Sequence, residues 1–241
     1  MGFTRIVEVA ATGSTNTDLM AALSTEEWPH LGVLVARRQT AGRGRAGRSW
    51  DTPGPGALTC SVVLAPGSAP VPWAPLLVGL AVRRAVAPWV PARLKWPNDV
   101  VVDEPPVPGW GWGRKLAGVL CELHPSGAVV AGIGVNCRQE DLPVPWAASI
   151  ATVAGRAPSV PALLGGVGDA LVAVLADWAG DPMAVRAEYA AASATLGQEV
   201  GVELPGGGVV RGRATGVADD GALVLADGVR VTVGDVRRVR A

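Results

Sequence analysis

Residues 40–50 read TAGRGRAGRSW and place Arg43, Arg45 and Arg48 in one short segment, spaced by glycines, an alanine and a serine. At an effective dielectric constant of about 20, two like charges about 4 Å apart repel by roughly 4 kcal/mol. Arginines this close together therefore predict a loop that shares its space with an anion. The glycines would let the backbone wrap closely around that ligand. We expect the loop to be mobile when empty and ordered when the anion is bound.

Two familiar phosphate-binding loops are excluded by the surrounding sequence. Gly42, Gly44 and Gly47 satisfy G-x-G-x-x-G, but that motif works only where a helix begins inside it, and Pro53 and Pro55 prevent a helix here. No glycine is followed by GK[ST], so the segment is not a P-loop either. An Arg/Gly segment that binds RNA is usually longer, repetitive and terminal. A small-molecule phosphate or carboxylate is therefore the favoured ligand, bound by the arginines themselves.

Strands and helices are predicted on both sides of this loop. It lies between two apolar strand patterns, LGVLVAR at 31–37 and LTCSVVL at 58–64. A strand at 5–10 and a helix capped by Ser14 or Thr15 precede them. The patterns that follow predict a helix at 72–86, strands at 93–96 and 100–102, a hairpin of strands at 116–123 and 128–135, and helices at about 160–178 and 182–196.

The pattern changes at Gly197. From there short alternating strands are separated by Gly and Asp turns, which predicts a small β-barrel. We therefore expect two domains, 1–196 and 197–241. A Pro/Gly-rich loop at 103–113 has no core-forming pattern and is either a lid or plain surface.

Composition restricts the class of protein. With 49% hydrophobic and 17% charged residues the chain is expected to fold, and its formal net charge of zero argues against a protein that coats nucleic acid. Cys60, Cys121 and Cys137 show no CxxC spacing, which indicates free thiols in a reducing cytoplasm. His30 and His124 are too few for a histidine-based metal site. We find no signal peptide and expect no membrane-crossing span, so we expect a cytoplasmic protein.

Lysine and asparagine are scarce in a chain whose basic residues are otherwise all arginine. The lysines are Lys95 and Lys115, and the asparagines are Asn16, Asn98 and Asn136. Each stands in a short motif with a Gly, Pro or Trp nearby. We therefore predict that these side chains serve chemistry that other residues cannot replace.

Four motifs in one order carry a family resemblance: GRGRAGR at 42–48, KWPNDV at 95–100, RKLAG at 114–118 and GIGVN at 132–136. With them the chain resembles the biotin–protein ligases over essentially its whole length. The resemblance implies an α+β fold, in which a mixed β-sheet with helices packed on it, like that of class II synthetases, precedes a small C-terminal SH3-like β-barrel. It also implies ATP-dependent formation of biotinyl-5′-AMP, with Mg²⁺ accompanying the triphosphate. Biotin then passes to one lysine of an acceptor, such as the biotin carboxyl carrier domain of acetyl-CoA carboxylase or another biotin-dependent carboxylase.

The resemblance also assigns residues by position. Biotin contacts fall on Ser14, Thr15, Asn16, Gln39, Arg43, Gly44, Arg45, Lys115, Gly118 and Gly132. ATP and adenylate contacts fall on Arg43, Arg45, Lys95, Asn98, Lys115 and Asn136. The catalytic set is Arg43, Arg45 and Lys115, with Asp99 as a candidate metal ligand or base.

The reaction suits these side chains. A carboxylate that attacks an α-phosphate is one anion approaching another, so neutralising charge is the main requirement, and Arg43, Arg45 and Lys115 would meet it. The polar ureido ring of biotin must be hydrogen-bonded when it is buried, and Ser14, Thr15 and Gln39 offer suitable donors and acceptors.

Several assignments have structural alternatives. Ser14 and Thr15 could simply cap a helix. Gly132 and Gly134 could serve sheet–helix packing instead of a flat ligand. Trp146 could stack on adenine, although core packing is the better expectation for it. Trp50 is expected to anchor the end of the arginine loop.

Two other functions stay open. A lipoate–protein ligase has a similar fold and activates a similar acyl chain. A nucleic-acid-binding module would use the arginine loop, but the other basic run, Arg237, Arg238 and Arg240, is readily explained as a solvated strand end. The repressor branch of the family carries an N-terminal helix-turn-helix domain, whereas this sequence starts at the catalytic domain, so DNA binding is not expected. The assembly is expected to be a monomer or a homodimer.

Overall fold

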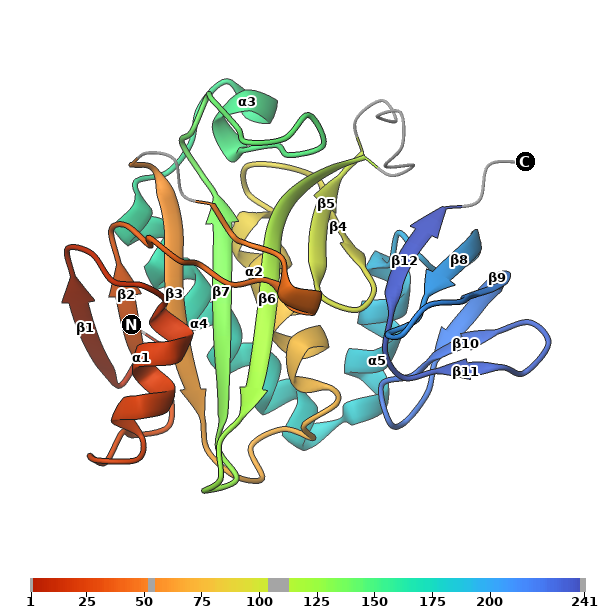
Figure 1. Cartoon of the computed structure of the whole chain (residues 1–241), viewed down its shortest axis with the longest axis horizontal. Coiled ribbons are helices and arrows are strands. Elements are labelled where there is room, and N and C mark those ends of the chain that lie inside the picture. Colours follow the sequence, from red (N-terminus) through yellow and green to blue (C-terminus); the bar gives the residue numbers. More distant parts are fainter. Residues whose placement is uncertain (1, 52–54, 104–112, 239–241) are drawn as a thin grey trace.

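The computed structural model describes residues 2–51, 55–103 and 113–238. Its main element is a seven-stranded mixed sheet in the order β1-β2-β3-β7-β6-β5-β4 (Figure 1). Only the β1–β2 pair in this sheet is parallel. At its centre β3 pairs with β7 in antiparallel fashion, with Ala57 opposite Asn136 at one end and Leu64 opposite Val129 at the other. The strands are β1 (Arg5–Val9), β2 (Gly32–Ala36), β3 (Ala57–Leu64), β4 (Ala92–Lys95), β5 (Asp99–Val102), β6 (Arg114–Leu123) and β7 (Val129–Asn136).

Helices cover the two faces of this sheet unequally. The helices α2 (Ala74–Val86) and α4 (Val160–Gly180) pack on one face over the large core, whereas α1 (Thr15–Ala22) lies on the other (Figure 1). Alternate side chains of β3 point to opposite faces, so that Val62 joins the large core and Val63 the small one. Among the described helices, the short α1 alone lies on the second face, so space remains there for a ligand.

A second sheet follows the helices α3 (Ile150–Ala154) and α5 (Pro182–Ala192). It is antiparallel, in the order β11-β10-β9-β8-β12, and confirms the expected small C-terminal β domain. The predicted boundary at 196/197 falls between α5 and β8. The strands are β8 (Glu199–Glu203), β9 (Val209–Val217), β10 (Leu223–Leu225), β11 (Arg230–Val231) and β12 (Asp235–Arg238).

Two indole rings hold the second sheet against the first. Trp73 Nε1 donates to the Asp219 carbonyl oxygen at 2.9 Å, and Trp96 Nε1 donates to that of Gly221 at 3.0 Å. Both tryptophans are almost completely buried. The turn between β9 and β10 therefore contacts the packed interior through two of its backbone carbonyls.

Three expectations need correction. The helix predicted to reach residue 196 ends at Ala192, because Ser193 adopts an extended conformation and the Ala194 N–H donates to the Leu94 carbonyl at 2.8 Å. A helix long and apolar enough to cross a membrane does exist, since α4 has a mean hydropathy of 1.6, but its buried face packs against α2 and β3. The short helix α3 was not expected at all. Most of the predicted loop at 103–113 lies outside the described residues.

Candidate active site

A cavity of about 600 Å³ lies on the α1 side of the sheet, where the arginine loop crosses in front of β7 and β6 (Figure 1). It brings together nearly all the predicted site residues, although Lys95 and Asp99 do not line it. The predicted residues in its wall are Ser14, Thr15, Asn16, Gln39, Arg43, Gly44, Arg45, Asn98, Lys115, Gly118, Gly132 and Asn136.

One end of the cavity is a chain of neutral hydrogen-bonding groups. The Gln39 side-chain oxygen accepts from the Thr15 N–H at 2.8 Å and from the Thr15 hydroxyl at 3.1 Å. Ser61 Oγ lies 2.7 Å from Thr15 Oγ1 and donates to Asn16 Oδ1 at 2.6 Å. Ser14 occupies the N-cap position of α1, yet its side chain makes no capping hydrogen bond and lines the cavity instead. This end suits a small polar head group that must be hydrogen-bonded on burial.

The arginine loop itself is a compact hairpin. The Gly44 N–H donates to the Arg48 carbonyl at 2.6 Å, and the Trp50 N–H donates to that of Gly42 at 2.8 Å. Gly42 is required for this close approach, since a Cβ there would lie 2.3 Å from the Trp50 carbonyl oxygen. At the tip, Gly47 has a φ of 73°, which glycine adopts without strain.

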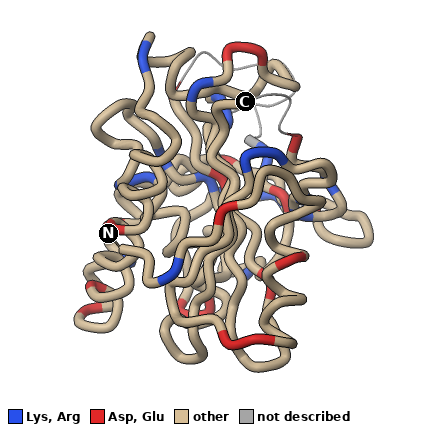
Figure 2. Tube along the Cα trace, turned by 90° about the vertical axis from the view of Figure 1, so that its left-hand side faces the viewer, with Lys and Arg blue, Asp and Glu red and all other residues tan. Residues whose placement is uncertain are grey.

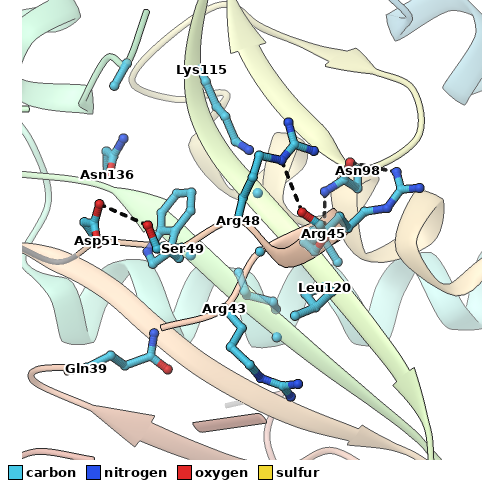
Figure 3. Close-up of a pocket in the computed structure, with 18 of the residues that line it drawn as sticks. Gln39, Arg43, Arg45, Arg48, Ser49, Asp51, Asn98, Lys115, Leu120 and Asn136 are labelled. Atoms are coloured by element: carbon cyan, nitrogen blue, oxygen red, sulfur yellow. Dashed lines mark hydrogen bonds between the residues drawn. The ribbon is translucent and has the colours of Figure 1, made fainter. Parts of the chain in front are cut away.

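The loop arginines point to different partners instead of converging on one anion (Figure 3). Arg43 Nη2 lies 2.5 Å from Glu122 Oε2, and Arg48 Nη2 lies 2.7 Å from Asp235 Oδ1. Arg45 Nη1 donates to the neutral Asn98 side-chain oxygen at 3.2 Å. The repulsion among the loop arginines is thus relieved partly by carboxylates of the protein. Among the described residues, no carboxylate forms an ion pair with Arg45, whereas Arg43 and Arg48 each have one.

Lysine 115 lies at the other end of the cavity, beside a buried carboxylate. Lys115 Nζ is 2.7 Å from Asp99 Oδ1, and Lys95 Nζ is 3.3 Å from Asp99 Oδ2. Burial alone would raise the pKa of Asp99, but attraction to Lys115 and Lys95 outweighs it and lowers this pKa to about 2. Burial lowers the pKa of Lys95, opposed by Asp99. Asp99 and Lys95 therefore support Lys115 from behind the wall, and the expectation that Asp99 is a metal ligand or base does not fit its place.

Arg45 stands across from this group with its charge partly desolvated. Burial lowers the pKa of Arg45, and the carboxylates of Asp235 and Asp99 oppose that change from a distance. A guanidinium remains protonated in such surroundings. Arg45 and Lys115 thus present two positive charges to the same cavity.

Both tryptophans singled out in the sequence line the cavity. The Trp50 ring lies against Gly134, where a Cβ would come 2.4 Å from Cε2, and its buried Nε1–H has no partner among the described residues. Lys115 Nζ is 5.6 Å from the centroid of this ring. Trp146 is half-buried, and its carbonyl accepts from the Lys115 N–H at 2.7 Å. The expectation of core packing for Trp146 is therefore wrong, and Trp50 does more than end the loop.

Several lining residues were not assigned from the sequence. Arg237, expected to be a solvated strand end, reaches the cavity from β12 while its Nε contacts Glu203 Oε1 at 2.6 Å. Asp51 accepts from Ser49 Oγ at 3.3 Å. The remaining unassigned members are Arg48, Ser49, Cys60, Val119, Leu120, Ile133, Pro143, Val144 and Ala147. The position of Arg48 in the loop was a usable signal, whereas nothing in the local sequence places Arg237 near the cavity.

Comparison with known proteins agrees with this arrangement. Residues 9–139 match the biotin/lipoate A/B protein ligase family, and residues 195–237 match the biotin protein ligase C terminal domain. A biotin–[acetyl-CoA-carboxylase] ligase of Mycobacterium tuberculosis is 38% identical, over 99% of this chain and 91% of its own length. A biotin protein ligase from Aquifex aeolicus, solved in complex with biotin and ATP, superposes with a TM-score of 0.83 at 26% identity, covering 98% of this chain and 100% of that one. The chain therefore belongs to the biotin/lipoate A/B protein ligase family and carries the C-terminal domain of the biotin protein ligases.

Proposed function

We infer that this chain is a biotin–protein ligase, which forms biotinyl-5′-AMP from biotin and ATP and transfers biotin to a lysine of an acceptor protein. The observation that carries this inference is the polarity of the cavity beside the arginine loop. A neutral hydrogen-bonding end built around Thr15 and Gln39 lies opposite a cationic end built around Lys115 and Arg45. A ligand with a neutral polar head and an acidic tail matches this pattern. The M. tuberculosis relative, 38% identical, supports biotin as that ligand.

In this proposal the cationic end performs the first half-reaction. The biotin carboxylate attacks the α-phosphorus, the bond to the β-phosphate breaks, and pyrophosphate leaves. Lys115 and Arg45 would hold the two anions together and stabilise the added charge in the transition state. Asp99 holds the Lys115 side chain in place through an ion pair at 2.7 Å.

The nucleotide would occupy the part of the cavity near Asn136 and the two tryptophans. Trp50 offers a buried N–H without a partner among the described residues, which is the kind of donor that a bound ligand satisfies. Lys95, by contrast, is buried behind Asp99 and would act on the nucleotide only through that carboxylate.

Mg²⁺ would enter with the triphosphate. Such ions are commonly held by one or two carboxylates together with substrate phosphates. Asp51 and Asn136 both line the cavity and lie at the same end of it in Figure 3, so their oxygens fit this requirement. When bound, the ion would neutralise phosphate charge.

The second half-reaction requires a protein partner. The amine of the acceptor lysine attacks the mixed anhydride, and AMP leaves. We propose a biotin carboxyl carrier domain of acetyl-CoA carboxylase, or of another biotin-dependent carboxylase, as acceptor, with a ligase that is a monomer or homodimer. Cytoplasmic catalysis suits three cysteines that are all free thiols. The nucleic-acid alternative gains little support, because basic and acidic residues are interspersed along the trace in Figure 2.

The test is mass spectrometry of the purified protein incubated with ATP, Mg²⁺ and either biotin or lipoate. Biotinyl-5′-AMP is expected with biotin, and no lipoyl-5′-AMP with lipoate. Lipoyl adenylate alone would assign the chain to the lipoate branch of the family. If neither acid is activated, the proposal is overturned and a nucleic-acid-binding assay becomes the next experiment.

A further inference from the structure

Glu122, near the end of β6, receives two donors on a single oxygen. Arg43 Nη2, from the arginine loop, lies 2.5 Å from Glu122 Oε2, and Asn16 Nδ2, from α1, donates to the same atom at 2.8 Å. Glu122 itself does not line the cavity, and its side chain is 28% exposed. It therefore joins a loop and a helix from just outside the site.

The contact with Asn16 sets the direction of the hydrogen bonds at the neutral end. Asn16 Nδ2 donates to both Glu122 and the Leu120 carbonyl, the latter at 3.0 Å, so that both of its N–H groups are used. The Asn16 side-chain oxygen must then face Ser61, which donates to it. An acceptor-only carboxylate at 122 thus fixes the orientation of the carboxamide, because the reverse orientation would set two acceptors against each other.

The contact with Glu122 gives Arg43 a different role from that of Arg45 in the arginine loop. The charge of Arg43 is balanced by Glu122, whereas Arg45 hydrogen-bonds to a neutral carboxamide. An arginine already paired with a carboxylate is a weaker attractor for a phosphate than one without such a partner. Arg43 is accordingly better suited to closing the loop over the neutral end than to neutralising the adenylate.

We propose that Glu122 is a positioning residue that ties the arginine loop to the biotin head-group end of the cavity through Arg43 and Asn16. The identity of the ligand rests on the proposed function, but the tie itself does not. Loss of the tie should weaken biotin binding and leave ATP binding nearly unchanged. It should also free the loop when no ligand is present.

The experiment compares Glu122→Gln with the wild-type protein. A glutamine oxygen can still accept from Asn16 but carries no charge for Arg43, so this variant removes the ion pair and keeps an acceptor for Asn16. Because a hydrogen bond between charged groups is strong, the Kd for biotin, measured by titration calorimetry, is expected to rise about tenfold, while the Kd for ATP stays within about twofold. Arg43→Gln should show the same split, and the double variant should bind biotin no more weakly than Arg43→Gln alone.

A second measurement needs no ligand. Trypsin cuts after arginine, so the rate of cleavage at Arg43, Arg45 and Arg48 in the unliganded protein reports on the tie directly. Glu122→Gln should be cut several times faster there than the wild type. The matched control is Glu188→Gln, which removes another partly exposed ion pair, between Glu188 and Arg84, neither of which lines the cavity. This control should change neither the Kd for biotin nor the rate of tryptic cleavage in the arginine loop.

The outcomes separate the two proposals. A wild-type protein that fails to bind biotin would defeat the proposed function, yet faster cleavage of Glu122→Gln would still support the tie. Unchanged cleavage and an unchanged Kd for biotin in Glu122→Gln would overturn the role of Glu122. So would an equal rise in the Kd values for biotin and ATP, which would indicate general damage to the site.

Discussion

At the scale of single residues, both lysines of the chain share one buried carboxylate. Asp99 contacts Lys95 and Lys115, and its own side chain is only 9% exposed. Removing one member of a buried charge cluster leaves the others uncompensated, which is far more damaging than losing a surface pair. The pair of lysines is therefore held by Asp99 as one unit.

This unit predicts a pH dependence of stability. The pKa of Asp99 is about 2 in the folded protein, below its ordinary value, so the folded state gains about 2 kcal/mol relative to the unfolded chain at neutral pH. That contribution is complete above pH of about 4 and is lost as the pH falls toward about 2. In Asp99→Asn, urea unfolding should show a lower free energy of unfolding at pH 7 and a flatter decline between about pH 4 and pH 2. An unaltered slope in that range would mean that Asp99 is not the group that titrates.

Lys115 carries the clearest catalytic prediction. Lys115→Met should lower the rate of adenylate formation by roughly one to two powers of ten, because it removes a charged donor from the reacting phosphate. Since Asp99 retains Lys95, the protein should still fold, with a reduced melting temperature. The rate is measured by mass spectrometry of biotinyl-5′-AMP, with Arg211→Met on exposed β9 as the control. Near-normal turnover would remove Lys115 from the mechanism.

The scarcity of lysine and asparagine in the sequence identified some of the residues that line the cavity, but not all of them. It selected Asn16, Asn98, Asn136 and Lys115, which all line the cavity, but it also selected the buried Lys95. Scarcity marks a residue that is hard to replace without saying whether it meets the ligand or supports a neighbour. Glu122 could not be found this way, because its role follows from a contact with Arg43 across 79 positions of sequence.

At the scale of elements, the middle of β7 is shaped to receive the end of the arginine loop. Trp50 lies directly on Gly134, and a Cβ at Gly118 of the neighbouring strand would come 3.3 Å from the same ring. A side chain on Gly134 must therefore displace the indole, and the loop with it.

The corresponding prediction concerns Gly134→Ala. The displaced Trp50 should weaken ATP binding several-fold and expose the loop to trypsin, while the sheet, whose hydrogen bonds do not involve Cβ, should remain intact. Gly216→Ala on β9 is the control, since a Cβ there meets nothing within 4 Å and the change of residue is the same. Binding is followed by titration calorimetry and the fold by circular dichroism. Equal ATP affinity in both variants would show that Trp50 does not need its present position.

Most elements were predictable because their patterns are local. The apolar run at 58–64 became β3, and the hairpin at 116–135 became β6 and β7. The errors occurred where a distant contact decides the local structure. The chain after Ala192 reads as helix, but it forms hydrogen bonds with β4, a partner about 100 positions away.

At the scale of the whole molecule, the C-terminal sheet takes part in the site. Its strand β12 supplies Asp235 to the loop residue Arg48 and brings Arg237 to the cavity. The backbone of the turn at 218–222 accepts hydrogen bonds from the buried Trp73 and Trp96. Residues of both sheets therefore shape one cavity, an arrangement that periodicity along the chain cannot predict.

The ion pair between Arg48 and Asp235 is expected to matter little for the stability of the fold but more for the retention of the adenylate. With Arg48 56% and Asp235 29% exposed, the pair should contribute at most about 1 kcal/mol to folding. Asp235→Asn and Arg48→Gln should accordingly melt within a few degrees of the wild type. Each should nevertheless release biotinyl-5′-AMP up to about fivefold faster, the kinetic equivalent of about 1 kcal/mol, because the loop loses its hold on the second sheet. Stopped-flow dissociation gives these rates, and the double variant should be no faster than either single one if both act through this contact. Additive rates would instead show that Arg48 and Asp235 hold the adenylate independently, and that the C-terminal sheet does not act through the loop.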